Sequence, residues 1–338
     1  MKKNLFFTIV ILFVMVLSAC GPSVPAKPVN TPTPQIIPTS ETDDTPQPVS
    51  AANPCIGAPA PKDGWHHIVV LMFENKTYDQ VIGPAPFITG LSKDCATAPN
   101  WMDADTKVDG TQDGHYNSKP NYATLTSGVS PSVHGLTNDK YETTTDVENI
   151  YHQMAQAGVS FKDYYDGDPG GCSVRFSGDY HDAIRYYTNV ADICDAHDVP
   201  FSMFQTDFDN GSLPAFSFIL LSKEHSMHDN SIASGDAYAK TVLEPLLNSK
   251  EYANGDLAIF LLWDENTPIP NVLLAPSVKP GTVINVKSGN PISHFSALRT
   301  WEEMLGLPLL GDTKSAPSLL PYFGDNSSLQ GSSSVSRN

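Results

Sequence analysis

The chain is poor in basic residues. Its 338 residues include 20 lysines and arginines against 37 aspartates and glutamates, which gives a formal net charge of −17. Proteins that bind nucleic acid non-specifically neutralise its phosphates with clusters of lysine and arginine. The composition therefore argues against a nucleic-acid partner. It is compatible with carboxylate-rich cation sites, although surface solubility explains most of the charge equally well.

The chain also lacks an apolar run long enough to cross a membrane as a helix, which takes about 20 residues. The apolar run Leu5–Leu17 follows Lys2 and Lys3 and leads into Ser18-Ala19-Cys20. A charged start, a short apolar core and small residues before the cut are typical of a secretory signal peptide. Leu17 to Cys20 resembles a bacterial lipobox, which implies cleavage before Cys20 and lipid attachment to its thiol. An ordinary signal peptide with an incidental cysteine is the alternative.

A lipid at Cys20 predicts a lipoprotein held by its anchor on the extracytoplasmic face of the cell envelope. Nine of the chain's 28 prolines lie between residues 21 and 54, where large apolar residues are rare. Such a segment stays extended and buries no core. We therefore expect a signal peptide at 1–19, a tether at 20–54, one folded domain at 55–324 and a disordered Ser- and Asn-rich tail at 325–338.

Cysteine is scarce, with five in the chain, four of them after the predicted lipid-bearing Cys20. An even number in an exported protein predicts two disulfides, and four cysteines allow three pairings. The sequence alone leaves the pairing open. We favour Cys55–Cys95 and Cys172–Cys194, which are nearest in the sequence. The cysteine spacings do not match a zinc site.

The stretch His67–Asn75 is the clearest structural signal. Six apolar residues run unbroken from Ile68 and stop at Glu74 and Asn75. A short continuous apolar run indicates a strand buried on both faces, as in α/β sheets, whose ligands bind beyond the carboxyl ends of the strands. The fold predicted is α/β, with a mainly parallel central sheet flanked by helices. Further strands are expected at 159–165, 214–221, 257–263 and 272–275, and helices at 146–157, 236–248 and 293–305.

Polar groups follow several of these strands. Glu74-Asn75 ends the first, His228-Asp229 lies beyond a middle strand, Asp264-Glu265 ends a later one, and His294 begins a helix. Oxygen and imidazole ligands together suit Zn, Mn or Fe, and oxygen ligands alone suit Ca or Mg. Ser118 precedes a short helix and fits either a helix cap or a nucleophile at the positive helix end, with the cap favoured by residue types alone.

Several segments, in order from about residue 66 to 310, resemble the bacterial phosphoesterase family. His67–Asn75 with Tyr78–Gly83 is similar to its opening block, and Ser118-Lys119-Pro120-Asn121-Tyr122 through Gly128 to its nucleophile segment. Further similar blocks are Met227–Asp236, Trp263–Glu265, Pro276–Gly281 and His294–Thr300. The family contains acid phosphatases and phospholipases C and belongs to the alkaline phosphatase superfamily. The resemblance implies an alkaline-phosphatase-like fold with metal ligands at the strand ends.

The resemblance also implies roles for individual residues. Ser118 is the nucleophile that forms a phosphoseryl intermediate. The implied metal ligands are Glu74, Asn75, Asp264, Glu265, His228, Asp229 and His294. The implied phosphate contacts are Asn75, Asn121, Asn138 and His228. Asn121 equally suits a turn after Pro120, and His115, His181 and His225 are expected at the surface. The cofactor expected is one or more divalent metal ions, with zinc first and manganese, calcium or magnesium as alternatives.

Three departures from the family pattern bear on substrate specificity. Residues 266–270 replace a longer loop that many relatives have, often with a glycine after the Trp-Asp-Glu block. Tyr116 stands where relatives often have histidine, and Lys119 where many have an apolar residue. These changes leave the core chemistry in place and alter the expected rim of the site.

We therefore expect a lipid-anchored, metal-dependent phosphoesterase. About 270 residues follow the tether, which matches the acid phosphatases of the family and favours hydrolysis of a small phosphomonoester. One alternative is a phosphodiesterase or phospholipase C acting on lipid head groups, with a phosphoinositide or phospholipid as substrate. Another is phosphate transfer to an envelope polymer. A third, from a different class, is a non-catalytic lipoprotein that binds a ligand.

Overall fold

The computed structural model describes residues 48–107, 109–115, 117–167, 172, 180–285 and 291–324. The predicted signal peptide, Cys20, most of the tether and the tail lie outside these residues, so the expectations about them stay predictions. The last tether residues are described, and they contact the folded domain. The backbone N–H of Ala51 donates to Asn248 Oδ1 at 3.0 Å. Residues 50–54 thus lie against the domain that we expected to begin at Cys55.

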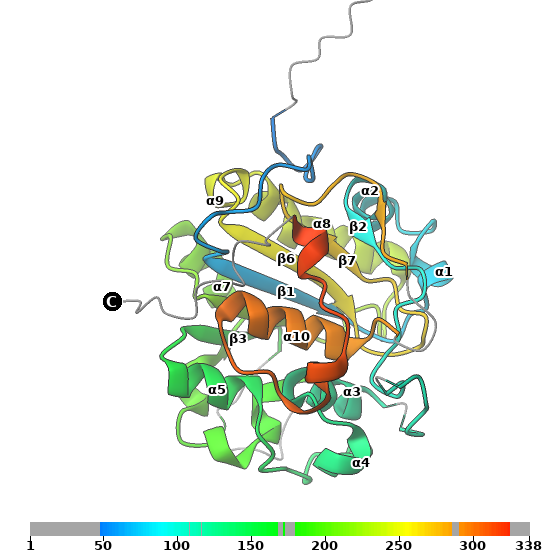
Figure 1. Ribbon diagram of the computed structural model, residues 1–338, viewed down its shortest axis with the longest axis vertical. Helices are drawn as coiled ribbons and strands as arrows, with labels where there is room; N and C mark the ends of the chain where they lie inside the picture. Colours follow the sequence, from blue (N-terminus) through cyan, green and yellow to red (C-terminus); the bar gives the residue numbers. More distant parts are fainter. Residues whose placement is uncertain are drawn as a thin grey trace, which may run out of the picture. The chain divides into compact units, whose positions relative to one another are not determined.

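A central sheet of eight strands positions the rest of the chain, in the order β4-β3-β5-β1-β6-β7-β2-β8 (Figure 1). All the strand pairs are parallel except the two that β7 makes, with β6 and β2. The mainly parallel α/β fold predicted from the sequence is confirmed. The strands are β1 His67–Phe73, β2 Ala96–Thr97, β3 Phe161–Tyr165, β4 Asp198–Pro200, β5 Phe216–Leu220, β6 Leu257–Trp263, β7 Val272–Leu274 and β8 Thr282–Val283.

Helices lie on both faces of this sheet. Figure 1 shows α10 in front of the strands and α8 behind them. The α-helices are α1 Tyr78–Val81, α2 Pro86–Asp94, α3 Ser118–Ser127, α4 Pro131–His134, α5 Ile150–Ala157, α6 Cys194–His197, α7 Ser202–Asp209, α8 Ile232–Leu247, α9 Lys250–Ala253 and α10 His294–Leu305. The 3₁₀ helices are η1 Ala183–Tyr186, η2 Thr188–Val190, η3 Gly311–Ser315 and η4 Leu320–Phe323.

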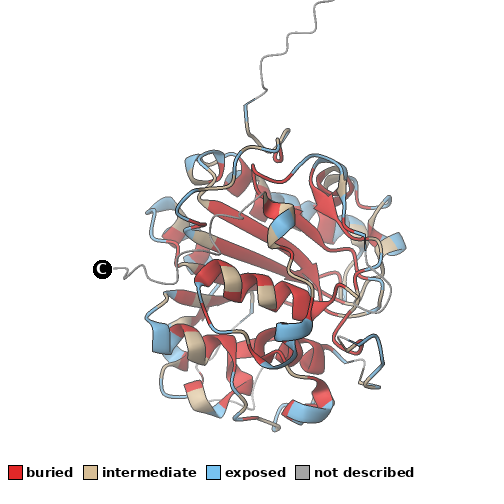
Figure 2. Cartoon of the chain, in the orientation of Figure 1, coloured by how far each residue is buried: buried red, intermediate tan, exposed pale blue. Residues whose placement is uncertain are grey.

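Strand β1 lies at the centre of the core. It pairs with β5 on one side and β6 on the other, and Ile68 to Phe73 are completely buried. Figure 2 shows the central strands coloured as buried. A strand that is buried on both faces has no side chains in contact with solvent. Its sequence is therefore continuously apolar instead of alternating between apolar and polar residues. Among the described helices, none combines the length and apolar character that a membrane crossing requires.

Two predicted helix starts were wrong. The helix predicted from Asp146 begins at Ile150, because the side chain of Asn149 caps it by accepting from the His152 N–H at 3.0 Å. The helix predicted from Asp236 begins at Ile232, because Ser231 caps it. Helix α8 includes Pro245 and runs to Leu247.

Asp236 has a different function from the one its sequence position suggested. Its carboxylate accepts from the backbone N–H groups of Phe87 and Ile88, at 3.0 and 2.9 Å. These groups belong to the first turn of α2, where N–H groups lack partners inside the helix and a negative charge is stabilising. Asp236 therefore joins α8 to α2.

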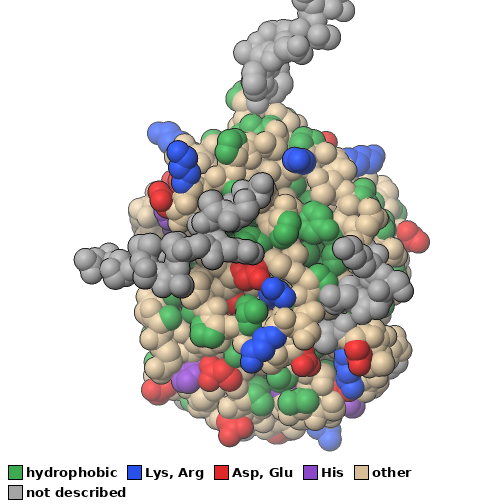
Figure 3. Space-filling model, viewed as in Figure 1, with side chains coloured by type: hydrophobic (Ala, Val, Ile, Leu, Met, Phe, Trp, Pro, Cys, Tyr) green, Lys and Arg blue, Asp and Glu red, His purple; other side chains and the backbone are tan. Residues whose placement is uncertain are grey.

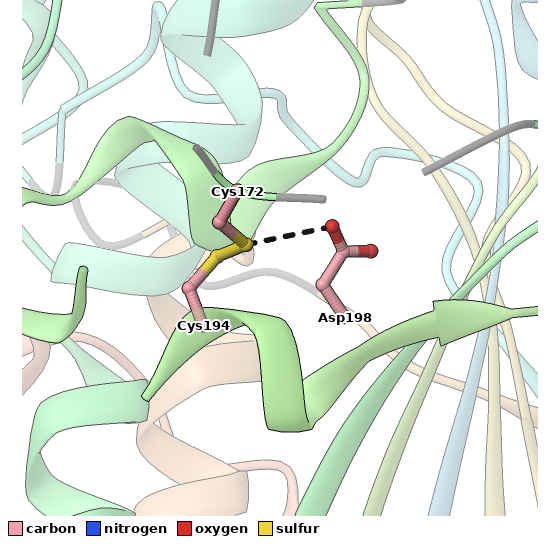
Figure 4. Close-up of side chains that lie close together, drawn as sticks. All are labelled: Cys172, Cys194 and Asp198. Atoms are coloured by element: carbon pink, nitrogen blue, oxygen red, sulfur yellow. Dashed lines mark hydrogen bonds between the residues drawn. A yellow bond between two sulfur atoms is a disulfide. The ribbon is translucent and has the colours of Figure 1, made fainter. Parts of the chain in front are cut away.

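Both favoured disulfides are present, Cys55–Cys95 and Cys172–Cys194. The first joins the start of the domain to the residue after α2. The second closes the segment before α6, and Figure 4 shows Asp198 beside it, with its carboxylate 3.7 Å from Cys172 Sγ. On the face in Figure 3, the described lysine and arginine side chains are dispersed and form no continuous basic patch.

Helix α10 carries a buried carboxylate that makes stability depend on pH. Glu302 accepts hydrogen bonds from the Leu310 N–H at 2.7 Å and the Thr313 hydroxyl at 2.8 Å. Burial raises the pKa of Glu302 from 4.5 to about 7, although these hydrogen bonds act in the opposite direction. The protonated form is favoured in the folded state. Glu302 therefore contributes its full stabilisation below the pKa that its carboxyl has in the unfolded chain. This stabilisation is lost as pH rises through the pKa that the carboxyl has in the folded protein.

We predict that Glu302→Gln removes this dependence. Between pH 4 and pH 8, the free energy of unfolding of the wild type should fall by about 3 kcal/mol relative to the variant, since one pKa unit corresponds to about 1.4 kcal/mol. Urea unfolding of both proteins at the two pH values measures the difference. Glu244→Gln, on the exposed side of α8, is the control and should behave like the wild type. If the free energies of unfolding of wild type and Glu302→Gln differ by the same amount at pH 4 and at pH 8, the prediction is contradicted.

Candidate active site

Two carboxylates emerge side by side at the carboxyl edge of the sheet. Phe73 of β1 and Trp263 of β6 are partners in the parallel register, so Glu74 and Asp264, which follow them, leave the sheet at the same level. Asp264 Oδ1 accepts from the Asn75 N–H at 2.9 Å. Both carboxylate side chains are completely buried. The convergence predicted for the ends of these strands is present in the structure.

Three loops at this edge turn through left-handed backbone conformations. The residues are Asn75, Met227 and Asn266, with φ of 49°, 73° and 76°. Asparagine adopts this region more readily than most residues, whereas for methionine it is strained. Gly235 makes room for Met227, since a Cβ at Gly235 would lie 2.3 Å from the Met227 Cγ. Strained backbone of this kind clusters at functional sites.

Ser118 begins α3 and lies against Glu74. Its Oγ donates to Glu74 Oε2 at 3.1 Å, and Tyr122, one helical turn later, donates its hydroxyl to Glu74 Oε1. Residues four apart share one helix face, so α3 presents both hydroxyls to the same carboxylate. The N-terminal end of a helix also carries partial positive charge, which stabilises an anion there.

His181 is the residue that sequence reasoning missed. It was expected at the surface, but it is completely buried, and its Nε2 lies 3.4 Å from Glu74 Oε2. Its ring is 5.7 Å from the Tyr122 ring and 5.8 Å from the His228 ring. It follows no strand and belongs to no periodic pattern, so the sequence carried no signal for it. The fold brings its segment over the sheet edge.

The carboxylates at this edge differ in protonation. Burial favours the neutral form of Glu74, but the charge of His181 and the hydrogen bonds from neighbouring groups hold the pKa of Glu74 below its usual value. Burial and the charges of Glu74 and Glu265 raise the pKa of Asp264 well above its usual range. Burial, Glu74 and Asp139 raise the pKa of Glu265 to about 8. A positive charge placed among these groups would allow all three to ionise.

The remaining predicted ligands lie around this centre with partners of their own. His228 Nδ1 is 2.6 Å from Asp229 Oδ1, and the Asp229 side chain is largely exposed. His294 is completely buried, and its Nε2 is 2.5 Å from the backbone carbonyl of Asp264. Burial lowers the pKa of His294, so the imidazole is neutral and donates to that carbonyl. In the structure Asp229 orients His228, and His294 holds the Asp264 backbone.

Two asparagines predicted to contact phosphate have structural partners. Asn121 is completely buried, its Oδ1 accepts from the Ala104 N–H at 2.8 Å and its Nδ2 donates to the Asn117 carbonyl at 2.9 Å. Both ends of its amide hold the backbone around α3, and because Nδ2 carries a second N–H, the phosphate contact stays a prediction. Asn138 Oδ1 accepts from the Lys140 N–H at 3.1 Å within its own loop.

Lys76 was not singled out from the sequence, although it follows Glu74 and Asn75 directly. Burial lowers its pKa, while the charges of Asp264, Glu74 and Asp229 act to raise it. The ammonium group therefore lies within electrostatic reach of the carboxylate centre. It is the kind of group that attracts a phosphate to an otherwise acidic edge.

The donor types at this edge suit a divalent cation. Asn75 Oδ1 and Glu265 Oε2 are buried and accept no hydrogen bond within the described part of the chain. Such oxygens are costly to bury unless something binds them. The carboxylates and imidazoles alone do not form a tight ligand group. Among the described residues, the one group of three with ligand atoms all within 4.8 Å is Cys172, Cys194 and Asp198, and its two cysteines are joined in a disulfide (Figure 4).

The fold is that of the alkaline phosphatase superfamily. A protein of that superfamily from Vibrio parahaemolyticus aligns over 83% of this chain and 75% of its own, with a TM-score of 0.51 and 11% identity. A putative sulfatase from Bacteroides thetaiotaomicron aligns over 81% and 76% with the same TM-score and identity. At such identities the similarity concerns the fold alone. The fold therefore defines the structural class, an alkaline-phosphatase-like α/β protein.

The chain belongs to the phosphoesterase family. The family model matches residues 108–269. A phosphatidylinositol-3-phosphatase from Mycobacterium tuberculosis is 30% identical over 268 residues, which cover 77% of this chain and 83% of that protein. A probable acid phosphatase from Kluyveromyces lactis is 26% identical over 262 residues, covering 72% of this chain and 58% of that protein. The resemblance noted in the sequence is confirmed.

The position of His181 leads to a prediction. Replacing it with alanine removes the imidazole beside Glu74 and should lower kcat for p-nitrophenyl phosphate by about 10- to 100-fold, the usual effect of removing a group that orients an active-site ligand. His181→Gln keeps an N–H donor and should recover part of the loss. His66→Ala, at the exposed start of β1, is the control. Equal kcat values for His181→Ala and wild type would contradict the prediction.

Proposed function

We propose that this chain is a metal-dependent phosphomonoesterase in which Ser118 is the nucleophile. The observation that carries the proposal is the hydrogen bond of 3.1 Å between Ser118 Oγ and Glu74 Oε2, at the edge where Asp264 and Glu265 also lie. A helix cap would use its hydroxyl on its own helix, and the residue in the cap position of α3 is Asn117. The Ser118 hydroxyl instead faces the buried carboxylates.

The chemistry begins with in-line attack of Ser118 Oγ on the phosphorus atom, which forms the Oγ–phosphorus bond as the bond from phosphorus to the alcohol oxygen breaks. Glu74 Oε2, which accepts the hydrogen bond of the hydroxyl, takes its proton. The N-terminal end of α3 stabilises negative charge on the phosphoryl group that Ser118 receives. A water molecule then attacks the phosphoserine, the Oγ–phosphorus bond breaks to release inorganic phosphate, and Glu74 returns the proton to Ser118 Oγ.

Glu74, Asn75, Asp264 and Glu265 are the residues proposed to hold the cation. Their oxygen atoms lie at neighbouring strand ends, and three of them, Asn75 Oδ1, Asp264 Oδ2 and Glu265 Oε2, accept no hydrogen bond from the described residues. A divalent cation supplies positive charge where the phosphoryl oxygens gather negative charge. These four oxygen donors suit magnesium, calcium or manganese, and zinc is favoured where an imidazole joins the oxygens.

His228 is proposed to protonate the leaving group. Asp229, at 2.6 Å from Nδ1, fixes the ring with its Nδ1–H bonded, which leaves Nε2 to exchange a proton with the alcohol oxygen. This pairing of a histidine with a carboxylate is the usual way to set the imidazole tautomer. The same ring takes a proton from the attacking water in the second half of the reaction.

The substrate proposed is a phosphomonoester. The two curated relatives are named as a phosphatidylinositol-3-phosphatase and a probable acid phosphatase, and both names support a monoester more than a diester. A phosphoinositide is therefore a candidate beside small soluble esters. The lipid anchor predicted at Cys20 would hold the enzyme at a membrane surface, where such lipids occur.

The nucleophile is tested by Ser118→Ala. Activity on p-nitrophenyl phosphate should fall by at least about 10³-fold, because the covalent route is lost. Brief reaction of the wild type with a phosphomonoester, followed by acid quenching and peptide mass spectrometry, should show phosphate on Ser118. Ser234→Ala, on the exposed side of α8, is the control. A Ser118→Ala protein that unfolds like the wild type and retains its activity would refute the role.

The cation is tested by chelation. Dialysis against EDTA should abolish activity and remove the metal found by elemental analysis, and one divalent ion should restore both. The same ion should raise the melting temperature of the metal-free protein, since a ligand that binds only the folded state stabilises it. Asp264→Asn should bind the ion more weakly than wild type in that assay. Full activity in protein shown to be free of metal would refute this part of the proposal.

A further inference from the structure

A group of three side chains forms one wall beside the active site. The rings of Tyr141 and Tyr180 have centroids 5.7 Å apart at an interplanar angle of 53°. Lys223 Nζ lies 4.5 Å from the centroid of the Tyr180 ring. Tyr141 is 41% exposed, and the other two side chains are partly exposed. We call Tyr141, Tyr180 and Lys223 the tyrosine–lysine wall.

The wall adjoins the residues proposed for catalysis. The Tyr180 ring centroid is 4.3 Å from that of His181, and His181 Nε2 is 3.4 Å from Glu74 Oε2. Lys223 is on the loop that carries His228, and its carbonyl accepts from the Asp229 N–H at 3.0 Å. A group bonded to a phosphate beside Ser118 and Glu74 is therefore within reach of the wall.

A buried lysine holds the Tyr141 part of the wall in place. Lys119 is 1% exposed, and its Nζ donates to the carbonyls of Lys140 and Thr143, each at 2.6 Å. These two residues flank Tyr141. Burying an ammonium group costs free energy unless carbonyl or charged partners replace its water. The loop that presents Tyr141 is therefore fixed before a ligand arrives.

The same lysine is linked to the Tyr180 segment. Lys119 Nζ lies 5.3 Å from the centroid of the Tyr186 ring, and the Tyr186 hydroxyl donates to the Tyr180 carbonyl. A second contact fixes the Tyr141 loop, since the Lys119 N–H donates to Asp139 Oδ1 at 3.0 Å. A wall held at several points loses little entropy when it binds a ligand, which favours specific recognition.

We propose that the tyrosine–lysine wall binds the alcohol part of the substrate, and that this part is a polyol ring carrying a second phosphate. The proposal rests on the phosphomonoesterase function proposed above. Tyrosine faces pack against the C–H faces of a ring, and an ammonium group over such a face binds an anion. Glu74, Asp264 and Glu265 make the floor of the site acidic, so a second phosphate requires a cation on the wall, and Lys223 supplies it.

The charge of Lys223 is tested with two soluble esters, inositol 3-phosphate and inositol 1,3-bisphosphate. Lys223→Gln should raise KM for the bisphosphate about tenfold and KM for the monophosphate less than twofold, with kcat unchanged for both. Sodium chloride at 0.5 M should shrink the difference between wild type and variant, because salt screens exposed charges. Lys240→Gln, on the exposed side of α8, is the control. Equal effects of Lys223→Gln on the two esters would overturn the proposal.

The ring contact is tested with Tyr141→Ala and its matched control Tyr141→Phe. Alanine should raise KM about threefold or more for both inositol esters, while phenylalanine, which keeps the ring face, should leave both unchanged. Equal KM values for Tyr141→Ala and wild type would overturn this part of the inference.

A binding measurement separates this inference from the proposed function. Calorimetric titration of inositol 1,3-bisphosphate into Ser118→Ala protein, with and without Lys223→Gln, requires no hydrolysis. Weaker binding with Lys223→Gln supports the wall even if Ser118 proves not to be the nucleophile. Unchanged binding, or no binding to Ser118→Ala protein that is folded and holds Lys223, overturns the wall even if the enzyme hydrolyses other phosphomonoesters.

Discussion

The parallel register of β1 and β6 determines where the site forms. Because Phe73 and Trp263 are opposite each other, the residues that follow them bring two carboxylates into one buried place. A shift of one strand by one residue would turn these side chains to opposite faces of the sheet. Both strands are buried on either face, so their continuous apolar sequences leave the register to the packing of individual side chains. The two carboxylates are brought together when β1 and β6 pair in this register.

Repulsion between the carboxylates at this edge explains why hydrogen-bond donors surround them. Buried carboxylates of like charge raise each other's pKa, and two segments of the chain place three donors against Glu74. Helix α3 contributes the hydroxyls of Ser118 and Tyr122, and a loop far away in the sequence contributes His181. The edge therefore combines a surplus of negative charge with donors that face it. That combination suits a site that receives a cation and a phosphate together.

The elements that could be predicted from the sequence are those with a strong local pattern. β6 was expected at the residues where it lies, and β1 within the stretch His67–Asn75, because continuous apolar runs bounded by carboxylates have few other interpretations. Strands β2, β4 and β8 were not predicted, since they are two or three residues long and, unlike β7, contain no continuous run of large apolar residues. The start of α8 was misplaced because Asp236, which looked like part of the first turn, caps a different helix. Local patterns do not reveal caps made between distant elements.

For the site, the strand-end residues Glu74, Asn75, Asp264 and Glu265 were found from their positions, and their meeting is present in the structure. His181 and Lys223 could not be found that way. They belong to irregular segments, and only the tertiary fold places His181 beside Glu74 and Lys223 above Tyr180. Asn121 lies in a recognised segment and holds the backbone with both ends of its amide, a structural role that its position in the segment did not indicate.

The contact between Met227 and Gly235 has an evolutionary consequence. One residue lies in a strained loop beside His228 and the other inside α8, and the space between them is too small for even one added methyl group. A larger residue at Gly235 therefore requires a smaller or displaced side chain at Met227. Descendants of this chain should enlarge position 235 only after position 227 has become smaller. Gly235 of helix α8 thus restricts the sequence of the loop that carries Met227 and His228.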